Sequence, residues 1–271
     1  MKKIGEGHKS EVFLMPDGRI LKLFFPHFAY LAPEEAEIAV MLAHAGVHAP
    51  RVDESLEVDG RPGLVFGNLK VGTTISDAVR KKPWQIIAAA RELAQMHASV
   101  HEHTSLELPS QRERIRQEIE TGNGLDTSMK DSALRILDDL PDGNAVCHND
   151  IHMLNVIVHP SDSMIIDWML ATRGNPLADL ASAVLQLRFG EQPQGLVARS
   201  ALEMGRAIFW RVYLQQYLRI RPVPKDELQR WELPAAVALA GRREGRMRRQ
   251  LLGRIDDLLA SSANQPTDLR K

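Results

Sequence analysis

The segment CHNDIHMLNVIV, residues 147–158, carries the strongest indication of how this chain folds. It places Asp150 five residues before Asn155, and Asn155 directly precedes a short β-branched run. A second apolar run ends at Asp167, and the turn residues 160–162 separate the two runs. This pattern predicts a β-hairpin. The hairpin would hold Asp150 and Asn155 at its entrance and Asp167 at its exit, so these three side chains should converge.

A convergent set of two aspartates and one asparagine suits phosphoryl transfer. The phosphates of ATP carry concentrated negative charge, and Mg²⁺, which neutralises it, prefers hard oxygen ligands and takes few of them from the protein. One aspartate and the asparagine can hold the ion without gathering too much negative charge. The remaining aspartate can accept the proton of an attacking hydroxyl. The sequence therefore predicts an enzyme that uses ATP and Mg²⁺.

The 147–158 segment resembles the catalytic loop of aminoglycoside phosphotransferases, choline kinases and related small-molecule kinases, which share the protein-kinase-like fold. The resemblance implies that Asp150 is the catalytic base and that Asn155 and Asp167 bind Mg²⁺. The segment 175–181 (NPLADLA) resembles the Asp-Pro motif of the same family. By this resemblance the structural support of the site comes from His148, His152 and Asp179, with polarisation of the acceptor as an equal alternative for His152.

The first part of the chain resembles the nucleotide-binding lobe of that family. Lys22 is the lone charge in an apolar run, and it matches the strand lysine that grips the α- and β-phosphates. Glu35 is the best match for its helix partner, with Glu34 and Glu37 as alternatives. The resemblance implies a phosphate loop with Gly5, Gly7 and Ser10 and an adenine-binding hinge with Phe66, Asn68 and Leu69.

The order of elements predicts an α+β, two-lobed, protein-kinase-like fold with a small antiparallel-sheet N-lobe and a larger, mainly helical C-lobe. Apolar runs predict strands at 12–15, 20–25, 52–58 and 63–66, with one helix after Pro33. Helical periodicity predicts helices at 84–102, 111–120, 130–140, 178–190, 200–219 and 241–260. We expect an ATP-binding lobe over 1–66, a hinge over 67–72 and a catalytic and acceptor-binding lobe over 73–271.

Composition narrows the classes of partner. The formal net charge of −1 gives no overall attraction to nucleic acid or to an anionic membrane. The chain has no apolar run of about 18 residues, and its first residues lack the apolar stretch of a signal peptide. With one cysteine, Cys147, no internal disulfide can form. We therefore expect a cytoplasmic enzyme whose partner is a small-molecule acceptor.

The nature of that acceptor is suggested by residues 241–255, which hold six arginines and one glutamate. Aminoglycosides are polycations, and a site for them should be lined with carboxylates. The arginines face solvent, or they help to bind an anionic acceptor or partner. We therefore expect the acceptor to be a hydroxyl-bearing metabolite, neutral or anionic.

Other functions remain as alternatives. A nucleotide-binding pseudokinase with a regulatory role is the first, and a kinase for aminoglycoside or macrolide antibiotics is the second. A protein kinase is disfavoured, because seven residues between Asp167 and Asn175 leave no room for a peptide-docking segment.

Two groups of residues also have simpler interpretations. Taken alone, Lys22 would be a charge that protects an edge strand from aggregation. His97 and His101 share one helix face, but no third ligand is suitably spaced in the sequence, so we expect no metal there. Asn149 and Met169 depart from the family pattern, since a glycine and an acidic residue are usual at these positions.

Overall fold

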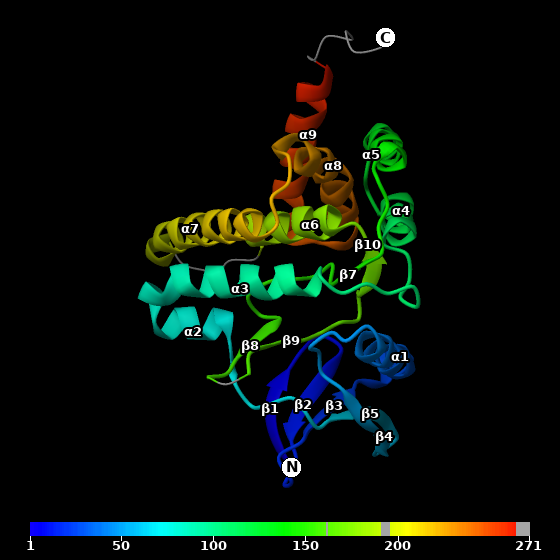
Figure 1. Cartoon of the computed structure of the whole chain (residues 1–271), viewed down its shortest axis with the longest axis vertical. Coiled ribbons are helices and arrows are strands. Elements are labelled where there is room, and N and C mark those ends of the chain that lie inside the picture. The colour runs from blue at the N-terminus through cyan, green and yellow to red at the C-terminus, as the bar shows by residue number, and fades with distance from the viewer. Residues whose placement is uncertain (161, 191–195, 264–271) are drawn as a thin grey trace.

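The computed structural model describes residues 1–160, 162–190 and 196–263, and it has two lobes (Figure 1). The lower lobe in that view is an antiparallel sheet of order β1-β2-β3-β5-β4 with one long helix beside it. This lobe consists of β1 (Lys2–Glu6), β2 (Ser10–Leu14), β3 (Ile20–Phe24), a 3-10 turn (Pro26–Phe28), α1 (Leu31–His44), β4 (Val52–Val58) and β5 (Arg61–Phe66). The predicted fold class, α+β with a sheet followed by helices, is confirmed.

The remaining elements form the upper, mainly helical lobe (Figure 1). They are β6 (Thr73–Thr74), α2 (Ile75–Lys81), a 3-10 turn (Pro83–Gln85), α3 (Ile86–Val100), α4 (Gln111–Thr121), α5 (Thr127–Asp139), β7 (Ala145–Cys147), β8 (Val156–Val158), β9 (Met164–Ile165), β10 (Thr172–Gly174), α6 (Pro176–Phe189), α7 (Leu196–Ile220), α8 (Lys225–Arg242) and α9 (Gly245–Ala263). The helices described in this lobe show no segment long and apolar enough to cross a membrane.

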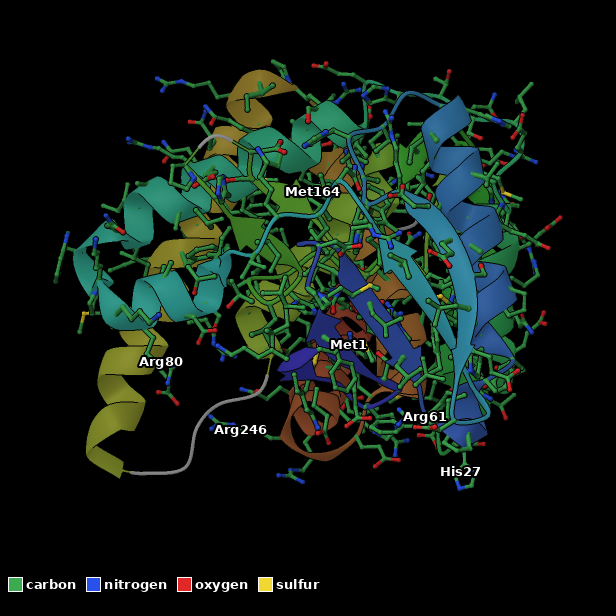
Figure 2. All side chains as sticks on the ribbon, turned by 90° about the horizontal axis from the view of Figure 1, so that it is seen from below. Met1, His27, Arg61, Arg80, Met164 and Arg246 are labelled. Atoms are coloured by element: carbon green, nitrogen blue, oxygen red, sulfur yellow. The ribbon has the colours of Figure 1, made fainter. Side chains whose placement is uncertain are left out.

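β3 is the centre of the N-terminal sheet. Its apolar side chains are buried on both faces, and Lys22 lies opposite Val12 of β2 and Leu64 of β5. The interpretation of Lys22 as an edge-strand charge is therefore wrong, because both neighbours of β3 are paired strands. Arg61, the first residue of the neighbouring strand β5 and labelled in Figure 2, donates to the backbone oxygens of Leu23 and Phe24.

One residue of the C-terminal lobe belongs to the core of the N-terminal lobe. Met169 is 5% exposed and packs in a cluster with β3, α1 and β5 that includes Phe24, Leu31 and Phe66. An acidic side chain at this position would be buried among apolar groups without a partner. Packing thus explains why methionine stands where the family usually has an acid.

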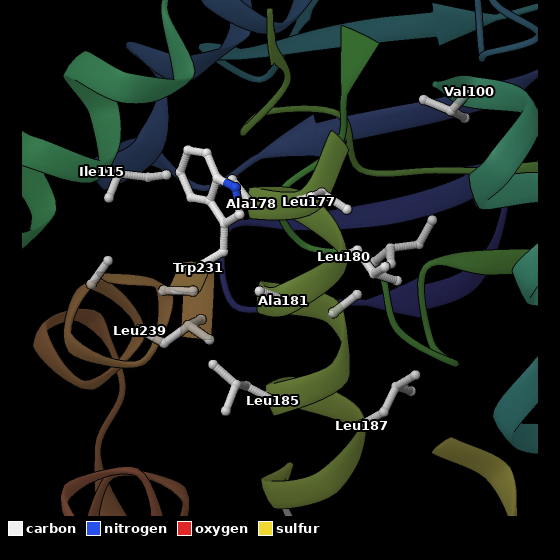
Figure 3. Close-up of a cluster of buried hydrophobic side chains, with 14 of the residues drawn as sticks. Val100, Ile115, Leu177, Ala178, Leu180, Ala181, Leu185, Leu187, Trp231 and Leu239 are labelled. Carbon is white, nitrogen blue, oxygen red and sulfur yellow. The ribbon is translucent and has the colours of Figure 1, made fainter. Parts of the chain in front are cut away.

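α6 lies at the centre of the C-terminal core. Figure 3 shows Leu180 and Leu185 on this helix, with Trp231 and Leu239 of α8 beside it. α6 is buried around most of its circumference, because α7, α8 and α9 all pack on it. Its first turn carries Asp179, so the functional segment at 175–181 is fixed in the most enclosed part of the lobe.

The C-terminal lobe also contains two small sheets. β8 pairs with β9 and with β6, which confirms a hairpin at 156–165, and β7 pairs with β10. The turn expected at 160–162 contains residue 161, which lies outside the described residues.

Three differences from the expected elements have clear causes. α8 was not predicted, because Pro234 lies inside it and suppresses the helical pattern. α2 was not predicted either, although the Thr74 side chain accepts the Asp77 backbone N–H in a recognisable cap. The helix at 111–120 was expected to be exposed, yet Ile115 and Ile119 are buried where α4 packs against α8.

Candidate active site

Lys22 links the two lobes. Its ammonium Nζ lies 2.8 and 2.7 Å from the two carboxylate oxygens of Glu35 and 3.6 Å from Oδ1 of Asp167. Glu34 and Glu37 are exposed, so the structure places Glu35 alone of the three candidates against Lys22. Burial raises the pKa of Glu35, and the ammonium of Lys22 opposes that rise. Two short contacts to one ammonium indicate an ion pair that fixes Lys22 towards the hairpin exit.

The loop before the hairpin is tied to its exit by His148, which is fully buried. The backbone N–H of Asp150 lies 3.2 Å from Nδ1 of His148, and Nε2 of the same ring lies 3.1 Å from the carbonyl oxygen of Ile166. These contacts fit a neutral ring that accepts through Nδ1 and donates through Nε2. Burial lowers the pKa of His148, which favours this neutral form.

Asn155 lies beside Asp167 across the hairpin. The Ile166 backbone N–H donates to the carbonyl oxygen of Asn155 at 2.9 Å, one residue before Asp167. The amide nitrogen of Asn155 donates to the backbone oxygen of Asp150 at 3.0 Å. Its amide oxygen is therefore the atom suited to a cation. This oxygen and the carboxylate of Asp167 are donors of the kind that Mg²⁺ prefers.

Asp167 has an unusual backbone. Its φ is +64°, in the left-handed region that residues other than glycine rarely adopt. Its side chain remains about half exposed (49%), unlike the enclosed side chains around it. Strain of this kind persists where the surroundings impose it, and it concentrates at functional sites. The conformation leaves the carboxylate accessible to a ligand while keeping it close to Lys22.

Asp150 is surrounded by positive and neutral donors. Nη2 of Arg243 lies 2.6 Å from its Oδ1, and Nε2 of His152 lies 3.7 Å from its Oδ2. Burial alone would raise the pKa of Asp150. The nearby His152 ring and the charges of Arg243 and Arg242 outweigh that effect and hold the pKa well below its usual range. Asp150 is therefore a carboxylate at neutral pH, as a proton acceptor must be.

Asp179 anchors the backbone of the loop that leads to Asp150. Its completely buried carboxylate accepts the backbone N–H groups of His148 at 2.6 Å and Asn149 at 2.9 Å. Nε2 of His97 and Nε2 of His101 lie 3.1 and 3.3 Å from its Oδ2. Burial would raise the pKa of Asp179, but these donors hold it well below the usual range. The carboxylate therefore accepts hydrogen bonds from two backbone N–H groups and from His101, while Nε2 of His97 lies close to it without a hydrogen bond.

Two tyrosines of α7 extend this cluster. The hydroxyl of Tyr213 lies 2.5 Å from Nδ1 of His97, and that of Tyr217 lies 2.5 Å from Nδ1 of His101. The sequence-based reason against a metal site here was wrong, because Asp179 brings a third ligand-type atom within 4.8 Å of both rings. The absence of a metal stays a prediction. Its support is now that Asp179 and both ring nitrogens of His101 are hydrogen-bonded to protein groups, and that Nδ1 of His97 contacts Tyr213; Nε2 of His97 has no hydrogen-bond partner among the described residues.

The structure shows what an asparagine contributes at position 149, where the family usually has a glycine. Its φ is +62°, a conformation that asparagine tolerates better than most residues. Its amide nitrogen donates to Leu170 O and Thr172 Oγ1, both at 2.8 Å, and its amide oxygen accepts from Gln111 at 2.9 Å. A glycine would keep the backbone angle but lose all three bonds. Asn149 therefore anchors the loop to the strand that follows Asp167.

The predicted phosphate loop is partly a strand. Gly5 lies in β1 opposite Val12, and Gly7 donates its N–H to the backbone oxygen of Ser10 at 2.9 Å. An added Cβ would meet Val12 at 3.8 Å from Gly5 and Ser10 O at 3.9 Å from Gly7, which are ordinary contacts. The packing of the protein itself does not require either glycine. Ser10 is buried at the start of β2.

The predicted hinge residues follow the end of β5. Phe66 is its last residue, is buried and packs with the N-terminal core, and Leu69 is partly buried against the same cluster. The side chain of Asn68 accepts the Arg51 backbone N–H at 2.8 Å and donates to Ala49 O at 3.0 Å. Both ends of the Asn68 side chain are thus occupied, which leaves its backbone groups for any contact with adenine.

The sequence did not single out individual arginines at the loop. Nη2 of Arg242, the last residue of α8, donates to the backbone oxygen of Asn149 at 3.0 Å. Arg243 contacts Asp150 and also Gln186 of α6, at 2.6 Å. The arginine-rich composition of 241–255 was the available signal. The interpretation that the whole segment simply faces solvent is wrong for these two residues.

The buried histidine pair makes stability depend on pH. Burial and then the nearby His97 lower the pKa of His101 from 6.5 to about 4. Between these values the unfolded chain binds a proton that the folded chain does not, so stability falls as the pH drops from 6.5 towards 4. The loss should reach about 3 kcal/mol over that window. Urea unfolding at several pH values measures it.

The matched variant for this measurement is His101→Gln, which cannot titrate. We expect it to be less stable than the parent at pH 7 and to show a shallower fall in unfolding free energy between pH 6.5 and 4. An unchanged slope in the variant would show that His101 is not the group responsible.

Comparisons with known proteins agree with this geometry. A sequence profile of the "Phosphotransferase enzyme family" matches residues 1–223. A curated relative, acyl-CoA dehydrogenase family member 11 of Gallus gallus, is 39% identical over 62 residues, and the match spans 21% of this chain and 8% of that protein. This chain therefore corresponds to a small part of that relative.

Similar solved structures cover nearly the whole chain. Aminoglycoside phosphotransferase APH(4)-Ia has a TM-score of 0.65 at 14% identity, covering 97% of this chain and 93% of that one. A thermostable mutant of it was solved with AMP-PNP and hygromycin B. Choline kinase from Cryptosporidium parvum Iowa II has a TM-score of 0.55 at 16% identity, covering 97% and 88%.

The structural matches are distant in sequence and show a shared fold, while the profile match covers most of the chain. Together they confirm the resemblance inferred from the catalytic loop, and with it the prediction that the protein is an enzyme that transfers phosphoryl groups. The chain belongs to the phosphotransferase enzyme family.

Proposed function

We propose that this protein transfers the γ-phosphoryl group of ATP to a hydroxyl group of a small molecule. The observation that carries the proposal is the position of Lys22, whose ammonium lies 2.7 Å from Glu35 and 3.6 Å from Asp167. A cation of the N-terminal lobe thus faces the acidic exit of the hairpin. ATP phosphates bound there would lie between Lys22 and the groups that follow the catalytic loop.

Each residue has one role in this proposal. Asp150 accepts the proton of the attacking hydroxyl, and Lys22, held by Glu35, binds the phosphates. Mg²⁺ would be held by the amide oxygen of Asn155 and the carboxylate of Asp167, where it would neutralise phosphate charge. His148 and Asp179 keep the loop in position through the hydrogen bonds described above.

The acceptor in this proposal is neutral or anionic. Arg242 and Arg243 lie at the loop that carries Asp150, and both are attached to it by hydrogen bonds. A polycationic acceptor would bring like charges together next to the base. Efficient phosphorylation of kanamycin-type antibiotics at micromolar KM would overturn this part of the proposal.

An ATP-consumption screen tests the proposal as a whole. Purified protein with Mg²⁺ and ATP would be offered sugars, amino alcohols, hydroxy acids, nucleosides and antibiotics, with ADP as the readout. We expect at least one class to raise ADP formation above the slow hydrolysis by water. ATP binding without turnover in any arm would favour the alternative, a regulatory pseudokinase.

Removing the carboxylate of Asp167 should abolish Mg²⁺-dependent nucleotide binding. In Asp167→Ala the cation loses a charged ligand and Lys22 loses the contact at 3.6 Å, although Glu35 still holds the ammonium. Nucleotide affinity measured by calorimetry with and without Mg²⁺ checks this. We expect the Mg²⁺-dependent gain in affinity to disappear while the melting temperature changes little, because the side chain is about half exposed (49%).

A variant that still gained affinity from Mg²⁺ would contradict the role of Asp167. The control is Asp131→Asn on the exposed surface of α5, which should behave like the parent.

A further inference from the structure

Arg243 contacts the carboxylate of Asp150, the proposed catalytic base. Its Nη2 lies 2.6 Å from Oδ1 of Asp150 and 2.6 Å from the side-chain oxygen of Gln186. It follows α8 in an extended conformation, with φ −109° and ψ 158°, and precedes α9, which begins at Gly245. The side chain therefore comes from a short connection between two helices rather than from the body of either one.

The neighbouring Arg242 has a different position. It donates to the backbone oxygen of Asn149 at 3.0 Å and lies 3.7 Å from the carboxylate of Glu118. Its side chain is 21% exposed, compared with 32% for Arg243. Arg242 is thus bound to the framework of the loop, whereas Arg243 contacts the carboxylate that must react.

The contacts of Arg243 leave part of its guanidinium unused. Both hydrogen bonds come from one nitrogen, Nη2, and Nε is buried without a hydrogen-bond partner among the described residues. A guanidinium binds a carboxylate or a phosphate best through two parallel N–H groups. A buried donor without a partner is unfavourable. Nε of Arg242 is in the same state, so what distinguishes Arg243 is that its guanidinium lies at the carboxylate of Asp150, where an acceptor atom of a substrate would bind.

In this arrangement Asp150 cannot act freely as a base. One oxygen is held by Arg243, and accepting a proton would leave that arginine without its counter-charge. A reactive complex therefore needs a new partner for Arg243. A neutral polyol offers no charge for this purpose, and a polycation adds repulsion. An anionic acceptor offers the charge and the two oxygen atoms that the guanidinium can bind.

We propose that the acceptor carries a carboxylate or a phosphate close to the hydroxyl that is phosphorylated, and that Arg243 leaves Asp150 to bind this anionic group. The inference rests on the proposed function, because it assigns the substrate class of the same site. Binding of an anionic acceptor then frees the carboxylate of Asp150 from Arg243. Water carries no charge for the arginine and leaves the contact in place.

The transfer itself balances as follows. The acceptor oxygen forms a bond to the γ-phosphorus of ATP as the bond from that phosphorus to the β–γ bridging oxygen breaks. The electron pair of the broken bond leaves with ADP, and the hydroxyl proton passes to the carboxylate of Asp150. Arg243 takes no proton in this step. It holds the anionic group of the acceptor and so places the hydroxyl beside Asp150.

The test compares Arg243→Ala and Arg243→Lys with Arg249→Ala, an exposed arginine of α9 that gives the same change in charge. ADP formation is measured with hydroxy carboxylates, with polyol phosphates and with neutral polyols, so the first two arms separate the two sources of anionic charge. In the parent we expect an anionic arm to give the highest kcat/KM.

In Arg243→Ala the KM for that acceptor should rise by about 10- to 100-fold while the KM for ATP stays unchanged. Arg243→Lys should fall between, because lysine keeps the charge but not the two parallel donors. Arg249→Ala should match the parent. The rate of ATP hydrolysis by water should increase in Arg243→Ala, because the carboxylate of Asp150 is no longer bound by the arginine.

Three results would overturn the inference: a neutral acceptor as the best substrate, an unchanged acceptor KM in Arg243→Ala, or loss of hydrolysis by water in that variant. These results leave the proposed function intact, because Mg²⁺-dependent turnover that needs Asp150 would still be present. Absence of turnover in every arm, including water, would instead overturn both.

Discussion

Replacing Asp150 by asparagine should lower kcat by about 10²- to 10⁴-fold, the usual contribution of a positioned general base. The substitution keeps the size and one acceptor oxygen of the side chain but removes its ability to take a proton. Nucleotide binding should persist, because Lys22, Glu35, Asn155 and Asp167 do not depend on the Asp150 carboxylate for their contacts with one another. Steady-state kinetics and ATP affinity by calorimetry check both parts.

The comparison with Asp167→Ala makes this prediction specific. The Asp150 variant should bind MgATP and fail to turn it over, whereas the Asp167 variant should fail to bind it in a Mg²⁺-dependent way. If the two phenotypes were exchanged, the roles of the two aspartates would be reversed.

The largest effect on stability is expected at Asp179. In Asp179→Asn the buried carboxylate that accepts from the backbone of His148 and Asn149 and from Nε2 of His101 becomes an amide with one donor end. The amide N–H₂ group must point at another donor, and the remaining hydrogen bonds lose the charge of their acceptor. We expect the free energy of unfolding to fall by about 3–5 kcal/mol, because buried donors are left unsatisfied and charge-assisted hydrogen bonds are lost.

Activity should fall as well in this variant, because the backbone of the catalytic loop loses two of its anchors. Urea unfolding at pH 7 measures the stability, and kinetics below the new transition measures the activity. Asp131→Asn, on an exposed position of α5, is the control for the chemical change alone. A stability within about 0.5 kcal/mol of the parent, the usual range for surface changes, would contradict the anchoring role.

The parts of the fold that were predictable are those encoded over short stretches. The hairpin that carries Asn155 and Asp167 follows from two β-branched runs and the turn between them, and the strand at 52–58 was predicted with its exact ends. Glu35 is preferred over Glu34 and Glu37 because its spacing to Gly46 resembles that of the family, and in the structure it shares the buried face of α1 with Leu31 and Ile38.

The parts that were not predictable depend on residues distant in the sequence. The contact between His101 and Asp179 joins positions 78 residues apart, and that between Arg243 and Asp150 joins positions 93 apart. Composition identified an arginine-rich segment, but only the end of α8 and its packing determine which arginine reaches the base. For the same reason the sequence does not show that the hydroxyl groups of Tyr213 and Tyr217 of α7 contact the histidine pair, since each contact joins positions 116 residues apart.

The burial of Met169 in the N-terminal lobe has a mechanical consequence for nucleotide exchange. Asp167 lies two residues before Met169, whose side chain packs among Phe24, Leu31 and Phe66 of the other lobe. A rotation that separates the lobes must either pull Met169 out of that core or carry the short segment around Asp167 along with it. In the proposed enzyme, opening for ADP release would therefore disturb Asp167, the proposed Mg²⁺ ligand, at the same moment, so departure of the product and loosening of the ion would become one event.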